Sequence, residues 1–212
     1  AAEIDELKSE HKSVQIKYMD GLGRPMQVVD VWSTPNGNDL IHLFYYDSFG
    51  REQYKYLPIT KFSNNGSYNH IAKSEIIDFY TESHPSHPDH VASSTAPYAE
   101  TVFENSPFNR VLQQGAPGST WQPANPSISG SGRTVKYEYA TNSYNEVRMF
   151  RVVADVLTPN GVYHSGSLYK TVIKDENWTS DKGKLHTTEE FKDKLGKVIL
   201  KRSYVERIDS SG

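Results

Sequence analysis

Three histidines follow one another at intervals of three in the stretch His-Pro-Ser-His-Pro-Asp-His, which runs from residue 84 to residue 90. In a polyproline II segment three residues make one turn, so the imidazoles of His84, His87 and His90 would share one edge. Neutral imidazoles bind zinc and copper. The alternative is an exposed Pro-rich loop with solvated histidines. We keep the three residues as candidate metal ligands and assign no metal and no other cofactor.

Acidic and hydroxyl side chains could serve hydrolysis, but their spacing supports no catalytic site. Paired carboxylates carry out glycoside hydrolysis, and the available ones are Glu75, Asp78, Glu82, Asp175, Glu176, Glu189 and Glu190. Nothing in the sequence places two of them in one cleft. The serines near Gly130 and Gly166 do not form a Gly-x-Ser-x-Gly motif, and the absence of cysteine excludes thiol chemistry. We therefore predict a protein that is not an enzyme.

Aromatic side chains offer a second kind of chemistry, the stacking of sugars. The sequence has 14 tyrosines, together with Trp32, Trp121 and Trp178, and such rings can form a flat platform for a glycan. In strands, however, aromatic residues more often pack against their cross-strand neighbours. A carbohydrate-binding module is therefore the alternative function.

One five-residue pattern recurs three times: Asp, any residue, Leu or Phe, Gly, and a basic residue. Average composition predicts on the order of 0.01 such matches in a chain of this length. Each copy follows a strand-like run that ends in an aromatic residue, and each is followed by another strand-like run, so we expect three hairpins. The structural residues of this turn motif are Asp20, Gly23, Arg24, Asp47, Gly50, Arg51, Asp193, Gly196 and Lys197.

The residue types of the motif explain how it would reverse the chain. The Asp carboxylate can accept hydrogen bonds from amides two or three residues on. Gly adopts the left-handed conformation needed for a type I turn closed by a bulge. We expect the Leu or Phe to pack back onto the hairpin and the basic residue to reach the Asp or a nearby carbonyl.

Other turn and helix signals complete the expected elements. The string Thr-Pro-Asn-Gly occurs at 34–37 and again at 158–161, and Pro-Asn-Gly is typical of a turn. Residues 69–82 are the expected short helix, with Asn69 as its cap and Ala72, Ile76 and Phe79/Tyr80 on one face.

Composition favours strands. Hydrophobic residues make up 36% of the chain, aromatic residues alone make up 12%, and 14 Gly and 11 Pro provide turns. The net charge of -3 comes without a basic face, so no nucleic-acid partner is expected. No apolar run approaches the roughly 18–20 residues of a membrane span.

Several longer strings resemble the segment that precedes the repeat array of Rhs/YD-repeat proteins of the Bacteroidetes type. They are residues 18–29, 45–51 with 56–58, 103–112, 115–118 with 121–123, and 171–177. The resemblance covers residues 14–206. It implies a much larger secreted or cell-surface protein whose repeats wind into a hollow β-shell that can enclose a toxin. The strict motif is unevenly spaced here, which fits an entry domain better than the shell wall.

We therefore expect a mainly β chain of antiparallel hairpins in a sandwich or partial barrel or shell. Residues 1–13 would be a leader or linker, 14–206 a β-rich domain with an internal boundary near 118–132, and 207–212 a tail. Its function would be that of a non-catalytic structural or interaction module that builds or caps the shell. Its partners would be the remainder of the parent chain and, in the alternative, a glycan or another cell-surface partner.

Overall fold

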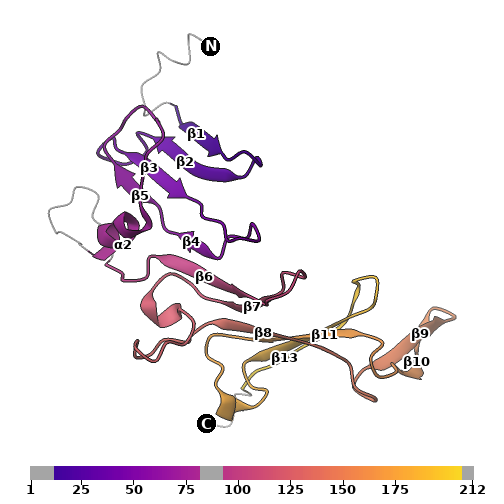
Figure 1. Ribbon diagram of the computed structural model, residues 1–212. Helices are drawn as coiled ribbons and strands as arrows, with labels where there is room; N and C mark the ends of the chain where they lie inside the picture. Colours follow the sequence, from indigo (N-terminus) through magenta and orange to yellow (C-terminus); the bar gives the residue numbers. More distant parts are fainter. Residues whose placement is uncertain (1–11, 82–92, 207–212) are drawn as a thin grey trace. The chain divides into compact units, whose positions relative to one another are not determined.

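The computed structural model describes residues 12–81 and 93–206 and is mainly β, with antiparallel strand pairs, as predicted (Figure 1). The chain forms two compact units. The N-terminal unit comprises residues 1–102 and 114–132, and the C-terminal unit comprises 103–113 and 133–212. Among the described residues, no helix has the length and apolar character needed to cross a membrane.

The N-terminal unit is built on a four-stranded antiparallel sheet with the order β1-β2-β3-β5. The bounds of these strands are β1 Val14–Met19, β2 Pro25–Val31, β3 Asp39–Leu43 and β5 Ile59–Lys61. Strand β3 alternates buried and half-buried residues, as expected where one face of a sheet meets a core. A further pair, β4 (Tyr54–Tyr56) and β6 (Tyr98–Phe103), is also antiparallel.

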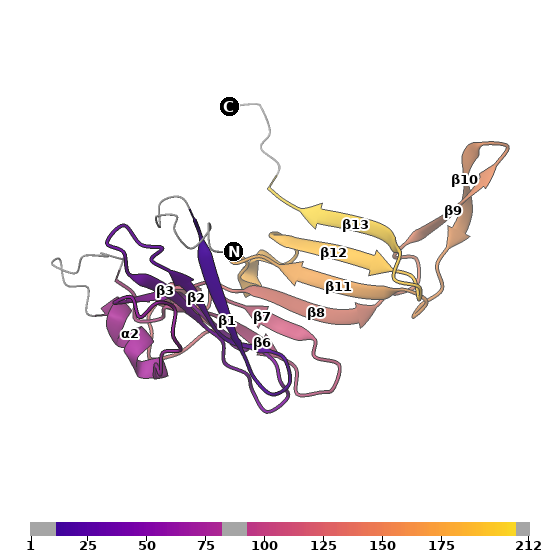
Figure 2. The ribbon, with the colours of Figure 1, turned by 90° about the horizontal axis from the view of Figure 1, so that it is seen from above.

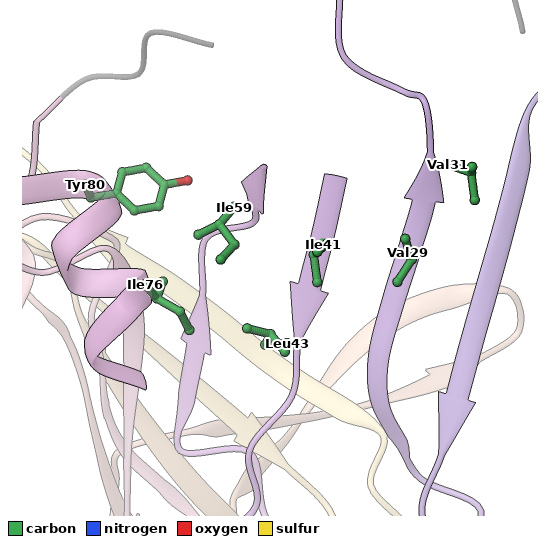
Figure 3. Close-up of a cluster of buried hydrophobic side chains, with 7 residues drawn as sticks. All are labelled: Val29, Val31, Ile41, Leu43, Ile59, Ile76 and Tyr80. Carbon is green, nitrogen blue, oxygen red and sulfur yellow. The ribbon is translucent and has the colours of Figure 1, made fainter. Parts of the chain in front are cut away.

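Helix α2 (Lys73–Thr81) provides the second side of this core. Its buried residues Ile76 and Tyr80 point toward the sheet, where they pack with the side chains of β2, β3 and β5 (Figure 3). The buried cluster consists of Val29, Val31, Ile41, Leu43, Ile59, Ile76 and Tyr80. Burying such aliphatic side chains contributes about 1.5–3 kcal/mol each, so this cluster is the main apolar stabilisation of the unit.

The helix begins later than Asn69, the cap that we predicted. The Asn69 amide donates instead to the side chain of Gln27 on β2, which holds this residue in an extended segment. The Glu75 carboxylate accepts a hydrogen bond from the Ala72 amide at 2.9 Å and so satisfies one free amide at the true start. Ala72 precedes the helix and is exposed, whereas Ile76 and Tyr80 are buried as expected.

Tyrosine rings pack between β4 and β6, edge to face for Tyr54 with Tyr98 and tilted for Tyr56 with Tyr98. The ring centroids of Tyr54 and Tyr98 are 5.2 Å apart, and those of Tyr56 and Tyr98 are 5.4 Å apart. Burial, followed by the neighbouring Glu100, raises the pKa of Tyr54 to about 12. These tyrosines therefore act as cross-strand packing residues, the commoner use of aromatics in sheets.

The C-terminal unit is an antiparallel sheet with the order β13-β12-β11-β8-β7 (Figure 2). The bounds are β7 Val111–Gln114, β8 Val135–Thr141, β11 Tyr169–Lys174, β12 Thr187–Lys192 and β13 Val198–Tyr204. A separate two-stranded ribbon, β9 (Arg148–Val153) with β10 (Val156–Val162), projects beyond the ends of these strands (Figures 1 and 2). Only Val147, Leu168 and Phe191 form a buried apolar cluster in this unit among the described residues.

The two Thr-Pro-Asn-Gly strings have different structures. Residues 34–37 form the expected turn between β2 and β3, closed by a hydrogen bond from the Gly37 amide to the Thr34 carbonyl at 2.9 Å. Residues 158–161 were predicted to be a turn and lie instead inside β10, where the pairing register shifts between Pro159 and Val162. Gly161 has a φ of 87°, which lets the strand form a bulge there. Pairing with β9 therefore overrides the local turn preference.

The core of the N-terminal unit gives a first prediction. Ile41 lies on the central strand β3 and is fully buried, so Ile41→Ala should lower the free energy of unfolding by about 2–5 kcal/mol. The matched control is Ile128→Ala, because Ile128 belongs to the same unit and is 36% exposed; we expect a change below about 0.5 kcal/mol. Urea unfolding followed by circular dichroism measures both, and equal effects would contradict this description of the core.

Candidate functional site

The turn at Asp20 is held by one carboxylate. Its Oδ1 atom accepts hydrogen bonds from the Leu22 amide at 2.8 Å and from the Arg24 amide at 2.9 Å, and Oδ2 accepts one from Arg24 Nε at 2.8 Å. The Gly23 amide donates to the Asp20 carbonyl, and Gly23 has a φ of 78°. The Arg24 amide, followed by its side chain and the Leu22 amide, lowers the pKa of Asp20. The carboxylate therefore stays ionised and works as the centre of the turn.

The other two copies repeat this geometry. Asp47 Oδ1 accepts from the amides of Phe49 and Arg51 at 2.8 and 2.9 Å, and Asp193 Oδ1 accepts from those of Leu195 and Lys197 at 2.9 Å each. Gly50 and Gly196 have φ angles of 77° and 83°. The Arg51 side chain also returns to Asp47, at 2.8 Å. Three separate stretches of sequence thus fold into one turn.

Each turn joins two antiparallel segments. β1 pairs with β2 around the first turn and β12 with β13 around the third, and both ladders shift register next to the turn, where a bulge was expected. The second turn joins β3 to β4, which are linked by a single bridge between Phe44 and Lys55. The loop therefore determines the register of the two long hairpins.

The apolar residue of the motif is mostly exposed and not buried on its hairpin, which corrects our expectation; the Phe49 ring does contact its own turn, with the Arg51 central carbon 4.7 Å from the ring centroid. Leu22, Phe49 and Leu195 are 79%, 65% and 83% exposed. The amide of this residue is bonded to the Asp carboxylate, while its side chain remains largely exposed. Each turn thus presents one large apolar side chain at its tip.

A related turn escaped the sequence pattern. In Ser106-Pro107-Phe108-Asn109-Arg110, Ser takes the place of Asp and Asn takes the place of Gly. Ser106 Oγ accepts from the Phe108 amide at 3.2 Å, and Asn109 has a φ of 53°. Phe108 is again at an exposed tip, at 80%. A search that allowed Ser for Asp and Asn for Gly, which favour the same turns, would have found it.

The first two turns are connected through Arg24. Its guanidinium lies over the ring of Tyr46, with the central carbon 4.3 Å from the ring centroid, and Tyr46 precedes the Asp of the second turn. The Tyr46 hydroxyl donates to the Pro25 carbonyl at 2.9 Å. A Cβ atom at Gly50 would lie 2.9 Å from Arg24 Nη1, the end of a flexible side chain that can move, so the requirement for glycine here comes from its positive φ.

The densest group of charges lies on one face of the C-terminal sheet. Lys170 Nζ is 2.6 Å from Glu146 and 3.0 Å from Glu189, and Arg202 Nε is 2.5 Å from Glu189. The Tyr204 hydroxyl donates to Glu189 at 3.0 Å. The two cations lie over the ring of Phe191, at 5.3 and 5.1 Å from its centroid. We call these side chains, Glu146, Lys170, Glu189, Arg202 and Tyr204, the Glu189 network. The network links strands β11, β12 and β13 to Glu146, which precedes β9.

The charge state of Glu189 does not suit a general acid. Burial would raise its pKa, but hydrogen bonds from Lys170, Arg202 and Tyr204 outweigh burial and lower the pKa to about 2. A general acid at neutral pH needs a raised pKa instead. The ionised network links three strands through its ion pairs and hydrogen bonds.

The remaining candidates do not come together. His84, His87 and His90 lie outside the described residues, and residues 12–81 and 93–206 contain no group of three or more potential metal ligands. The three tryptophans lie in separate segments, after β2, in a 3-10 turn at Ser119–Trp121, and after β11. The Trp178 ring is covered by Lys174 Nζ, 3.8 Å from its centroid.

Two glycines of the first turn provide a matched test. A Cβ atom would meet nothing within 4 Å at either Gly21 or Gly23, but only Gly23 has positive φ. Gly23→Ala should therefore lower the free energy of unfolding by about 1–2 kcal/mol. Gly21→Ala should be neutral within about 0.5 kcal/mol. Chemical denaturation measures both, and equal losses would show that conformation at Gly23 is not the constraint.

The Glu189 network predicts that the free energy of unfolding falls at low pH. The pKa of Glu189 is lower in the folded chain than in the unfolded chain, so its contribution is complete above about pH 4.5 and is lost as the pH falls toward about 2. Glu189→Gln should remove on the order of 3 kcal/mol at pH 7 and flatten the stability profile between pH 4.5 and 2. Urea titrations across this range provide the profile. The exposed Glu206→Gln is the control, and an equal flattening there would contradict the assignment.

Comparison with known proteins places the chain in a family without assigning a function. No curated protein and no solved structure matches it. Residues 1–141 match the family described as "Domain of unknown function (DUF6443)". The match includes the turns at Asp20, Asp47 and Ser106 and ends before the turn at Asp193. Because the match covers well over half of its residues, the chain belongs to the DUF6443 family.

Proposed function

We propose that this chain is a non-catalytic structural module of a larger secreted or cell-surface protein of the Rhs/YD-repeat kind, in which it builds or caps a β-shell. The observation that carries the proposal is the apolar side chain at the tip of each turn. Leu22, Phe49, Phe108 and Leu195 occupy the same position of the turn and are all at least 65% exposed. A large apolar residue at one equivalent exposed position in every turn is best explained by a surface that packs against more chain.

The β9–β10 ribbon is a second surface that further parts of the parent chain would cover. Two strands alone are marginally stable in water, and this ribbon exposes large apolar side chains on both faces. Phe150, Val152 and Leu157 fall on one face by register and are 48%, 68% and 65% exposed, and Val153 and Val156 on the other are 46% and 64% exposed. The remaining repeats of the parent chain are the partner that would cover them.

The outer edge of strand β13 is a third feature that favours assembly with further chain. Among the strands of the described residues, β13 pairs only with β12, so its outer edge presents backbone donors and acceptors. At the start of β13 lies a groove of about 460 Å³ whose walls include Phe150, Tyr163 and Leu200.

The proposal predicts different behaviour of one variant in two settings. In the 212-residue chain alone, Leu195→Ser should change the free energy of unfolding by less than about 0.5 kcal/mol because Leu195 is 83% exposed. In the full-length product of the gene, the same change should lower the thermal midpoint by several degrees, because the tip is then buried. Lys194→Ser, at the adjacent exposed position, is the control and should be neutral in both.

Hydrogen exchange tests the edge and the ribbon directly. Amides of residues 150–157 and 198–204 should exchange at least about tenfold more slowly in the full-length protein than in the chain alone, whereas those of β2 should be unchanged. The proposal fails if the gene encodes no further β-rich sequence, or if exchange at both segments is the same in the two proteins.

A further inference from the structure

A hollow of about 560 Å³ lies on the C-terminal sheet over β8 and β11, which are neighbouring strands (Figure 2). Its lining residues are Arg110, Tyr139, Ala140, Thr141, Tyr169, Lys170 and Thr171. All of them belong to the C-terminal unit. The function proposed above gives this hollow no role.

Two tyrosines and two threonines form a diagonal pattern in the hollow. Tyr139 on β8 pairs with Thr171 on β11, and Thr141 on β8 pairs with Tyr169 on β11. Because alternate residues of a strand share a face, the four side chains lie on one side of the sheet. Tyr169 is 59% exposed and Tyr139 is 37% exposed. The exposed Tyr169 ring and the less exposed Tyr139 ring therefore alternate with two threonine hydroxyl groups on one surface.

The wall beside Tyr139 is fixed and carries little net charge. Arg110 donates to Glu104 from Nε at 2.8 Å and from Nη2 at 2.7 Å. These bonds, with one from Ser106, lower the pKa of Glu104 to about 2, so the carboxylate is ionised and compensates the guanidinium. The guanidinium lies over the Tyr139 ring, 5.0 Å from its centroid, and the Tyr139 hydroxyl donates to the Val111 carbonyl at 2.9 Å.

The charged side chains next to Tyr169 on β11 and β12 point to the opposite face or are paired. Lys170 sends its ammonium group to the Glu189 network, on the face opposite to Tyr169. On the same face as Tyr169, Lys192 is paired with Glu190 at 2.6 Å. The hollow therefore offers the exposed ring of Tyr169 beside Tyr139 and two hydroxyl groups, and the two cations that line it, Arg110 and Lys170, are both paired.

From this geometry we propose that the hollow is a binding site for a neutral saccharide chain. The C–H face of a pyranose ring packs on an aromatic ring, and its hydroxyl groups need donors and acceptors such as those of Thr141 and Thr171. Compensated charge disfavours an anionic ligand, which would need an unpaired cation. The site lies on residues other than the turn tips, the ribbon and β13. An experiment can therefore disprove the saccharide site without affecting the proposed structural module.

The test uses the full 212-residue chain and defined oligosaccharides. Affinity electrophoresis through gels containing xylan, laminarin, galactomannan or polygalacturonate selects a polymer, and calorimetry with the corresponding hexasaccharide measures the dissociation constant. We expect a neutral polymer to bind, with an affinity unchanged by about 0.5 M NaCl. Tyr169→Ala should weaken binding about tenfold or more. Tyr144→Ala is the matched control, since Tyr144 is 66% exposed in the same unit but does not line the hollow.

Several outcomes would overturn the saccharide site. One is that no neutral oligosaccharide binds at concentrations up to about 10 mM. Another is that Tyr169→Ala and Tyr144→Ala have the same effect while both variants keep the circular dichroism of the parent chain. Binding limited to polygalacturonate and abolished by salt would assign an anion site. A dimer that dissociates in Tyr169→Ala, without saccharide binding, would assign the surface to a second copy of the chain.

Discussion

The hydrogen bonds from two backbone amides to one aspartate carboxylate are the constraint on which the rest of this structure depends. They hold a five-residue loop in a conformation that only a glycine or asparagine at its fourth position adopts readily. The loop then determines which residues of the two flanking strands face each other. It also fixes the side chain that stands at the tip. Hairpin register and the exposed apolar tips are thus two consequences of one local interaction.

The two units obtain their stability in different ways. The N-terminal unit buries a cluster of aliphatic residues between a sheet and helix α2. The C-terminal unit has three buried apolar residues among those described and relies on the Glu189 network, in which two carboxylates pair with two cations that lie over the ring of Phe191. Breaking such a buried pair is costly because the remaining charge loses its partner. A sheet stabilised in this way leaves much of its surface for interactions.

The two faces of the C-terminal sheet differ in chemistry because side chains alternate along each strand. One face carries Lys170, Glu189 and Arg202, and the other carries Tyr139, Tyr169 and their threonine neighbours. The first face is occupied by its own ion pairs, whereas the second remains accessible. The proposed roles of the chain use different parts of the unit: strand edges, ribbon and turn tips for assembly, and the tyrosine face for a saccharide.

The sequence by itself determined the local features of this protein. The three aspartate turns and the mainly β class could be predicted because the Asp, the Gly and the amides they engage lie within five residues of one another. Tertiary structure decided the rest. Pairing with β9 turned the second Thr-Pro-Asn-Gly into a bulge, and contact with Gln27 delayed the start of the helix. Glu146, Lys170, Glu189 and Arg202 meet only because strand register aligns residues far apart in the chain, which no local pattern specifies.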